Sequence, residues 1–333
     1  MTNNNIQRHL HATPLNAGNP RTGVAPQRGE PPHGSVSVIG IDLGGTAIKL
    51  GRFTVDGALL QSMTVATPQP PAPEMVLNVI VSALQELDSN NQAVAIGVGM
   101  PGPSDPEGRI ALVSINLPGW RDVPLAQWLE EKTGKPTILA NDANCAGLGE
   151  AWLGAGRRFK NFIMLTLGTG VGGAVFIDGK LFIGHHGAAG ELGLISLHSS
   201  GPECNSGNQG SLEQFTSIRA IRRRTGKEPS ELGELAETGN VEALNFWQEY
   251  GRDLGIGLTS LIYVLTPQAI LIGGGVGASA KFFIPSAKAE IEKRVFITSR
   301  VGLEILPAEL GNSAGMLGAA KLALTKINTQ LSL

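Results

Sequence analysis

Two glycine-rich segments of this 333-residue chain carry residue types that bind phosphate. The first runs from Asp42 to Thr46 with the sequence Asp-Leu-Gly-Gly-Thr, and the second from Gly168 to Gly173 with the sequence Gly-Thr-Gly-Val-Gly-Gly. Each follows an apolar run, so we expect a tight turn at the end of a strand, where several backbone N–H groups point at one small volume. The hydroxyl groups of Thr46 and Thr169 add further donors.

An acidic residue, Asp42, stands in the first of these turns. A carboxylate beside phosphate groups is repelled unless a cation lies between them, so we expect Asp42 to hold Mg²⁺ together with the phosphates of a donor. A third glycine cluster, Gly273 to Gly275, follows the apolar run Ala269 to Ile272. One such turn alone is equally compatible with a structural hairpin, but three of them favour phosphate binding.

The segments around the first two turns share one plan. Ile39 to Gly57 and Ile163 to Gly179 each contain an apolar strand, a Leu-Gly pair with further Gly and Thr, an apolar return strand and an Asp-Gly turn. The copies are too far apart in the chain for a solenoid. They predict two similar domains that each offer a glycine turn to a shared cleft, and the alternation of strands and helices predicts the α/β class.

Composition excludes several classes of protein. The net charge of -2 gives no indication of a nucleic-acid or membrane partner. The stretch from Leu254 to Ala280 has no charge, but Pro267 and the glycine cluster divide it, which indicates a buried helix and a buried strand. Only two cysteines, Cys145 and Cys204, are present, which excludes a disulfide framework and favours the cytoplasm.

The predicted organisation has three parts. Residues 1–34, rich in Asn, Pro and Arg, are expected to form a disordered tail. We expect residues 35–140 to form a smaller α/β domain, completed by a C-terminal helix over residues 312–326, and residues 141–311 to form a larger α/β domain. The segment Gly97 to Gly102 fits the dinucleotide pattern G-x-G-x-x-G, but the prolines around it predict a loop instead of the required helix. Asp122, followed by Pro124, has the features of a helix N-cap.

Together the motifs resemble the ROK family of sugar kinases and sugar-responsive repressors, and within it the bacterial glucokinases. The resemblance extends from Val36 to Leu324 and rests on an ordered set of segments, which are Asp42–Thr46, Asn116–Trp120, Asn141–Asn144, Leu167–Gly173, Gly190–Gly193 and Leu212–Glu213. It implies a two-domain, actin-like (ribonuclease H-like) α/β fold with a cleft between the domains. It also implies a hexose kinase of carbohydrate metabolism that forms a homodimer.

The resemblance assigns roles to single residues, with Asp142 as the catalytic base. The residues expected to contact the sugar are Asn116, Asn141, Asp142, Glu191 and Glu213. Those expected to bind the donor are Asp42, Gly44, Gly45, Thr46, Lys49, Thr166, Gly168, Thr169, Gly170, Gly273, Gly274 and Gly275. Carboxylates and amides suit the hydroxyl groups of a hexose, and a carboxylate beside a phosphate site can accept the hydroxyl proton during phosphoryl transfer. A structural alternative for Asp142 is a helix N-cap.

The sequence departs from the family at a structural zinc site. Many members hold Zn²⁺ through one histidine and three cysteines, and the corresponding residues here are Leu194, Cys204, Ser206 and Ser211. One thiolate cannot hold a tetrahedral zinc ion, so we expect no zinc. The missing histidine is also an expected sugar contact, which leaves the identity of the hexose open.

The expected reaction is transfer of the terminal phosphoryl group of ATP to the 6-hydroxyl of glucose. Inorganic polyphosphate is an alternative donor, because Thr67 to Pro70 resembles a stretch of polyphosphate-dependent relatives. Fructose, mannose and N-acetylhexosamines are alternative sugars. A sugar-sensing transcriptional regulator is the alternative of another class, but residues 1–34 show no helical periodicity for a DNA-binding helix pair.

Overall fold

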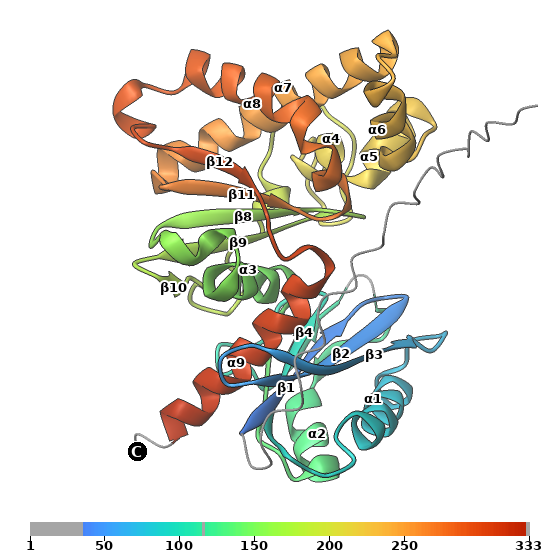
Figure 1. The fold of residues 1–333 in the computed structure, drawn as a ribbon. Helices are drawn as coiled ribbons and strands as arrows, with labels where there is room; N and C mark the ends of the chain where they lie inside the picture. Colours follow the sequence, from blue (N-terminus) through green and yellow to red (C-terminus); the bar gives the residue numbers. More distant parts are fainter. Residues whose placement is uncertain (1–35, 115–116, 331–333) are drawn as a thin grey trace, which may run out of the picture. The chain divides into compact units, whose positions relative to one another are not determined.

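The computed structural model describes residues 36–114 and 117–330. The chain divides into two units, residues 1–33 and residues 34–333. The tail expected at residues 1–34 therefore lies outside the described residues. Within the second unit, two five-stranded sheets carry the helices that position the predicted site (Figure 1).

The first sheet has the strand order β3-β2-β1-β4-β7. Its strands are β1 (Ser37–Leu43), β2 (Ala47–Thr54), β3 (Leu59–Ala66), β4 (Ala93–Met100) and β7 (Thr137–Asn141). The first three form an antiparallel meander, and β4 and β7 continue the sheet in parallel with β1. Helices α1 (Pro73–Leu87) and α2 (Leu125–Thr133) pack on one face, because alternate residues such as Ile39 and Ile41 point to that side. We call this sheet with α1, α2 and α9 the first lobe.

Helix α9 (Ala314–Gln330) packs on the other face of this sheet, against β1 and β4 (Figure 1). Glycine permits the close approach, since a Cβ on Gly40 would lie 1.9 Å from the Met316 carbonyl oxygen and one on Gly97 1.8 Å from that of Ala319. Gly97 therefore belongs to a strand that packs against a helix. The G-x-G-x-x-G match lies in β4 and the loop after it and opens no helix, as expected.

The second sheet has the strand order β10-β9-β8-β11-β12. Its strands are β8 (Phe162–Leu167), β9 (Val171–Ile177), β10 (Lys180–Leu181), β11 (Ala269–Gly273) and β12 (Glu304–Pro307). One face packs against α7 (Val241–Leu265) and neighbouring helices, and the other against α3 (Asp142–Leu153). The remaining helices of this second lobe are α4 (Glu213–Thr216), α5 (Ile218–Thr225), α6 (Pro229–Glu237) and α8 (Ala280–Arg294). Short elements elsewhere are β5 (Ala111–Val113), β6 (Arg121–Val123), η1 (Ala155–Arg158), η2 (Leu192–Leu194), η3 (Gly275–Ser279), η4 (Ile297–Ser299) and η5 (Gly311–Ser313).

The predicted repeat corresponds to two antiparallel hairpins, β1–β2 and β8–β9, each followed in its sheet by a parallel strand. The uncharged stretch from Leu254 to Ala280 contains the end of α7 and the whole of β11, so the prediction of a buried helix and a buried strand is confirmed. In the described part of the chain, no helix combines the length and apolar character needed to cross a membrane.

The predicted helix start at Asp122 is wrong. Asp122 lies in β6 with a φ of 51°, and α2 begins at Leu125 with Pro124 at its N-cap position. The expected C-terminal helix is α9, and its packing on the first sheet supports the assignment of that helix to the smaller domain. The exact domain boundaries stay a prediction.

Candidate active site

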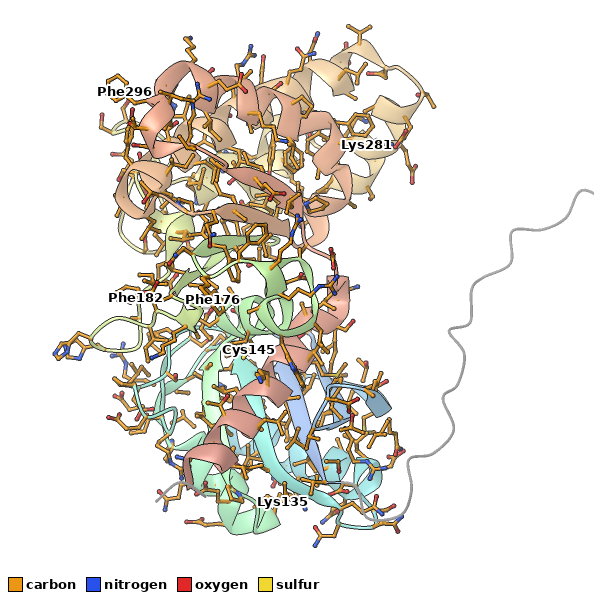
Figure 2. All side chains as sticks on the ribbon, turned by 60° about the vertical axis from the view of Figure 1, so that its left-hand side comes forward. Lys135, Cys145, Phe176, Phe182, Lys281 and Phe296 are labelled. Atoms are coloured by element: carbon orange, nitrogen blue, oxygen red, sulfur yellow. The ribbon has the colours of Figure 1, made fainter. Side chains whose placement is uncertain are left out.

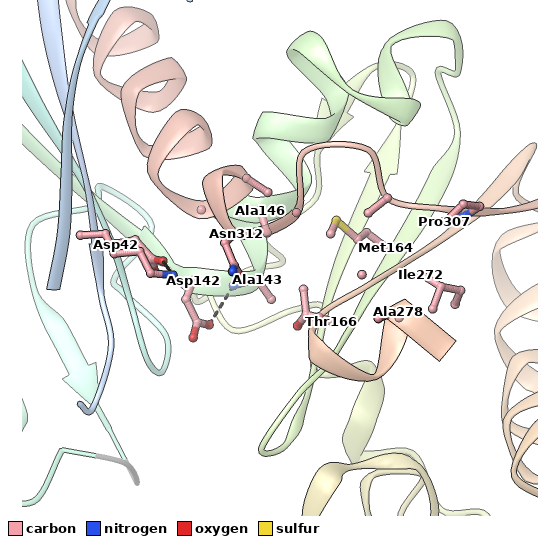
Figure 3. Close-up of a pocket in the computed structure, with 18 residues that line it drawn as sticks. Asp42, Asp142, Ala143, Ala146, Met164, Thr166, Ile272, Ala278, Pro307 and Asn312 are labelled. Carbon is pink, nitrogen blue, oxygen red and sulfur yellow. Dashed lines mark hydrogen bonds and ion pairs between the residues drawn. The ribbon is translucent and has the colours of Figure 1, made fainter. Parts of the chain in front are cut away.

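A pocket of about 420 Å³ lies where the ends of β1, β8 and β11 meet helix α3 and the segment that enters α9. The predicted residues that line it are Asp42, Lys49, Asp142, Thr166, Gly273 and Gly274. In Figure 3, Asp42 and Asp142 lie together at one end of the pocket, and Met164, Ile272 and Pro307 lie toward the other. The pocket thus has one acidic end and one largely apolar end.

Asp42 and Lys49 come from the paired strands β1 and β2, in which they are directly opposite residues. The Lys49 Nζ atom lies 3.5 Å from Asp42 Oδ2. Burial raises the pKa of Asp42, and the charge and hydrogen bond of Lys49 partly offset that rise. Asp42 and Asp142 both line this cavity, and proteins hold Mg²⁺ through one or two carboxylates together with substrate phosphates and water, so the residues present fit this ion.

Asp142 is the first residue of α3 and directly follows β7. Its Oδ1 accepts a hydrogen bond of 2.8 Å from the Ala143 backbone N–H (Figure 3). Burial, and then the negative charges of Asp42 and Glu191, raise the pKa of Asp142 to about 6. A carboxylate with this pKa is charged at neutral pH and yet a stronger proton acceptor than an ordinary aspartate.

The N-cap of α3 is Asn141, one residue before Asp142. Its Oδ1 accepts hydrogen bonds from the backbone N–H groups of Ala143 (2.9 Å) and Asn144 (3.2 Å), and its Nδ2 donates to the Gly102 carbonyl (3.4 Å). The N-cap alternative considered for Asp142 is therefore taken by its neighbour, which leaves the second carboxylate oxygen of Asp142 for other partners. A role of Asn141 in sugar binding stays a prediction.

The first glycine turn is supported by the chain that follows β3. The Gly44 N–H donates to the Ala47 carbonyl (3.0 Å), Thr67 Oγ1 donates to the Gly44 carbonyl (2.6 Å), and Gln69 Nε2 donates to the Gly45 carbonyl (3.0 Å). Because the C=O and N–H of one peptide unit point in opposite directions, the N–H groups of Gly45 and Thr46 point away from Thr67 and Gln69. That orientation is the one needed to bind an anion on the free side of the turn.

The second and third turns lie against each other. Gly274 has a φ of 83°, and a Cβ there would lie 2.4 Å from the carbonyl oxygen of Leu167, at the end of β8. Glu213 Oε2 accepts a hydrogen bond of 2.9 Å from the backbone N–H of Val171, which belongs to the second glycine-rich segment and begins β9. Partial desolvation, and then repulsion from Glu213, raise the pKa of Glu191. Two predicted sugar-binding carboxylates are therefore neighbours and border the second turn.

Not all predicted residues line the pocket. Asn116 lies outside the described residues, and those outside the pocket lining are Gly44, Gly45, Thr46, Asn141, Gly168, Thr169, Gly170, Glu191, Glu213 and Gly275. The lining residues that were not predicted from the sequence are Ala143, Ala146, Met164, Ile272, Gly277, Ala278, Pro307, Ala308, Gly311, Asn312, Ala314 and Gly315. The one available signal was the run Gly311-Asn312-Ser313 between a strand and a helix, a composition typical of loops.

The residues that correspond to the zinc ligands of the family lie in a loop that is held by hydrogen bonds. Burial raises the pKa of the Cys204 thiol, but hydrogen bonds from Ser206 and Ser211 lower it, and the net shift is downward. Asn208 Nδ2 donates to the Leu194 carbonyl (2.8 Å) and to Ser196 Oγ (3.1 Å). Of the four residues that correspond to the zinc ligands of the family, Cys204 alone carries a ligating side chain, so this set does not fit a tetrahedral zinc ion. Among the described residues, no group of three His, Cys, Asp or Glu side chains could hold a metal ion.

The sequence profile of the ROK family matches residues 38–326, and the chain belongs to this family. It is 32% identical over 312 residues to a glucokinase of Thermotoga maritima, covering 88% of this chain and 98% of that enzyme. A ROK glucokinase of Streptomyces griseus, solved in complex with glucose and AMPPNP, superposes with a TM-score of 0.77 at 32% identity, covering 87% of this chain and 99% of that one. The two-domain, actin-like α/β fold is thereby confirmed.

Regulators of the same family share less sequence identity with this chain. The xylose repressor of Bacillus subtilis is 28% identical over 263 residues, covering 76% of this chain and 68% of the repressor. The sequence identity to the two glucokinases is higher, at 32%, and the match covers nearly their whole length.

Proposed function

We propose that this chain is a hexose kinase that transfers the terminal phosphoryl group of ATP to the 6-hydroxyl of glucose. The observation that carries the proposal is the placement of Asp142, with a pKa of about 6, in one pocket with residues of the phosphate-binding turns. The glucokinase relatives support glucose as the sugar, and the AMPPNP complex of one of them supports ATP as the donor.

In the proposed mechanism, the apolar end of the pocket receives the nucleoside and the glycine turns bind the phosphates. Asp42 would hold Mg²⁺ with the donor phosphates, and the ion would neutralise charge on the transferring group. Lys49, beside Asp42, adds a positive charge on the same side. The turns supply backbone N–H groups that are already oriented, so phosphate binding requires little rearrangement.

Asp142 accepts the proton of the sugar hydroxyl as the oxygen attacks the phosphoryl group. We assign the remaining hydroxyl groups of the sugar to Asn116, Asn141, Glu191 and Glu213. Support for this assignment comes from the repulsion that Glu191 exerts on Asp142 and that Glu213 exerts on Glu191, because charges that affect one another must lie close together. A hexose that bridges these carboxylates presents one hydroxyl to Asp142.

The test is a coupled assay of sugar phosphorylation with the wild-type protein and Asp142→Asn. The wild type should phosphorylate glucose with ATP, and the variant should lose roughly a hundredfold or more in turnover while binding glucose with similar affinity. The matched control is Asp178→Asn, which removes the same charge at an exposed hairpin turn and should remain fully active.

Parallel assays separate the alternatives. Inorganic polyphosphate replaces ATP in one series, and fructose, mannose or N-acetylglucosamine replaces glucose in another. A protein that binds glucose but phosphorylates no sugar with either donor would instead be a sugar-sensing regulator. Near-normal turnover of Asp142→Asn would remove Asp142 from the role of base.

We also propose that the enzyme acts in the cytoplasm as a homodimer and needs Mg²⁺ but no zinc. Location in the cytoplasm is supported by the two buried cysteines, which are free thiols. The homodimer follows from the family resemblance alone. Chelation of Mg²⁺ should abolish activity, because the donor phosphates would lose their counter-ion.

A further inference from the structure

One fully buried carboxylate takes no part in the reaction proposed above. Glu150 lies in α3, two turns after Asp142, and its exposed fraction is 0%. Its Oε2 accepts hydrogen bonds from the backbone N–H groups of Ala155 (2.8 Å) and Glu309 (3.2 Å), and its Oε1 accepts one from Leu310 (2.8 Å). These three backbone donors replace the hydrogen bonds to water that the carboxylate loses on burial.

The backbone that Glu150 holds belongs to one wall of the pocket. Glu309 and Leu310 lie between β12 and η5, in the middle of the segment from Pro307 to Gly315. This segment contributes Pro307, Ala308, Gly311, Asn312, Ala314 and Gly315 to the pocket lining. Its start is anchored by the Ala308 N–H, which donates to the Ile272 carbonyl (2.9 Å) of β11. Glu150 anchors the middle of the segment.

The end of the wall also rests on α3. A Cβ on Gly149 would lie 2.5 Å from the Ala314 carbonyl oxygen, and one on Gly318 would lie 1.6 Å from the Cys145 carbonyl oxygen. Cys145 accordingly lies in the interior, where α3 meets α9 (Figure 2). The helix that presents Asp142 at its start therefore fixes the pocket wall through its later residues.

We infer that Glu150 is a positioning residue for the donor, which holds the Pro307–Gly315 wall at a set distance from the catalytic helix. The inference rests on the proposed function, because it takes the pocket to be the nucleotide site. A carboxylate is needed, since both of its oxygens accept hydrogen bonds. In a glutamine, one of these oxygens becomes an NH₂ group that faces an N–H donor.

The main test compares Glu150→Gln with the wild type. We expect the KM for ATP and the Kd of AMPPNP, measured by calorimetry, to rise roughly tenfold, with the KM for glucose within about twofold of the wild type. Hydrogen exchange at the amides of Glu309 and Leu310 should become faster. The control is Glu309→Gln, which removes a charge from the exposed side chain of the same segment but keeps its backbone N–H, and should leave all three constants unchanged.

A second variant moves the carboxylate of Glu150 without replacing it. In Gly154→Ala, the new Cβ would lie 2.0 Å from Glu150 Oε2, so the carboxylate must shift away from its donors. The same selective rise in the constants for the nucleotide is expected, and this variant decides the question if Glu150→Gln does not fold.

Unchanged constants for the nucleotide in a folded variant would overturn the inference. So would an equal rise in the KM values for ATP and glucose, or a lower melting temperature with unchanged kinetics, since either would indicate a general structural role. Failure of the proposed function is a different result, because the wild type itself would then show no ATP-dependent phosphorylation.

Discussion

At the residue scale, the position of Asp142 determines its chemistry. Asn141 caps α3, so the carboxylate of Asp142 is not needed as the cap and lines the pocket instead. Burial and the nearby charges of Asp42 and Glu191 then make it a stronger proton acceptor. The same surroundings make the charged form unfavourable in the folded state, so activity is gained at a cost in stability.

Two consequences for pH dependence follow from the pKa of about 6. First, kcat/KM should fall as the pH drops below about 6, because Asp142 becomes protonated and can no longer act as a base. Second, Asp142→Asn should stabilise the fold by about 1–2 kcal/mol at pH 7.5, where the wild-type carboxylate is charged in both states but unfavourable in the folded one. The gain should vanish below about pH 4, where both states are protonated.

Urea unfolding of both proteins at pH 7.5 and pH 4, together with a pH–rate profile of the wild type, tests these points. A variant less stable than the wild type at pH 7.5 would contradict the electrostatic explanation. So would a rate that stays constant between pH 7.5 and pH 5.

At the element scale, the sequence predicted the strands and helices that are determined by local residue patterns. Apolar runs ending in glycine marked β1, β8 and β11, and these strands carry Asp42, Thr166 and Gly273 into one pocket. The start of α2 was not predictable, because Asp122 adopts a left-handed conformation while pairing in β6. The Pro307–Gly315 wall was missed for a similar reason. Its position depends on Glu150, about 160 residues earlier in the chain, and no local pattern reports such a contact.

The loop between Glu191 and Glu213 is held together by hydrogen bonds of its backbone and side chains. The backbone of Leu212 donates to the Ile195 carbonyl (2.9 Å), which brings the two ends of the loop together. Asn208 ties the middle of the loop to Leu194 and Ser196. Both proposed sugar carboxylates flank this loop, so its order should determine their spacing.

We therefore predict that Asn208→Ala raises the KM for glucose roughly fivefold to tenfold and leaves the KM for ATP nearly unchanged, because the loop lies outside the pocket lining. Asn205→Ala, at an exposed position of the same loop, is the control and should behave like the wild type. A strong zinc chelator should alter neither the melting temperature nor the KM for glucose. A stoichiometric zinc ion in the purified protein would refute this explanation of the loop.

At the scale of the whole unit from residue 34 to residue 333, the pocket draws on both lobes. Asp42 and Lys49 come from the first sheet, and Thr166 and Gly273 come from the second. Helix α9 packs on the first sheet and also contacts α3 of the second lobe, so this helix crossing helps to join the lobes. The sequence predicted a shared cleft from the repeated hairpins, but the crossing of α3 and α9 depends on glycines whose role becomes visible only in three dimensions.

The last prediction is that glucose brings the two lobes closer together. The proposed sugar contacts are divided between Asn141, at the end of β7 in the first lobe, and Glu191 and Glu213 of the second, and a ligand that touches both sides favours the closed arrangement by its additional contacts. Closure also excludes water, which competes with the sugar for the phosphoryl group.

Spin labels on cysteines introduced at Gln85 in α1 and Lys288 in α8, both exposed, report the distance between the lobes by pulsed electron paramagnetic resonance. Saturating glucose should shorten that distance, whereas a pair at Gln85 and Gln127, both in the first lobe, should not change. An unchanged distance between Gln85 and Lys288 would mean that the cleft is preformed, and the exclusion of water would then have to come from the bound substrates themselves.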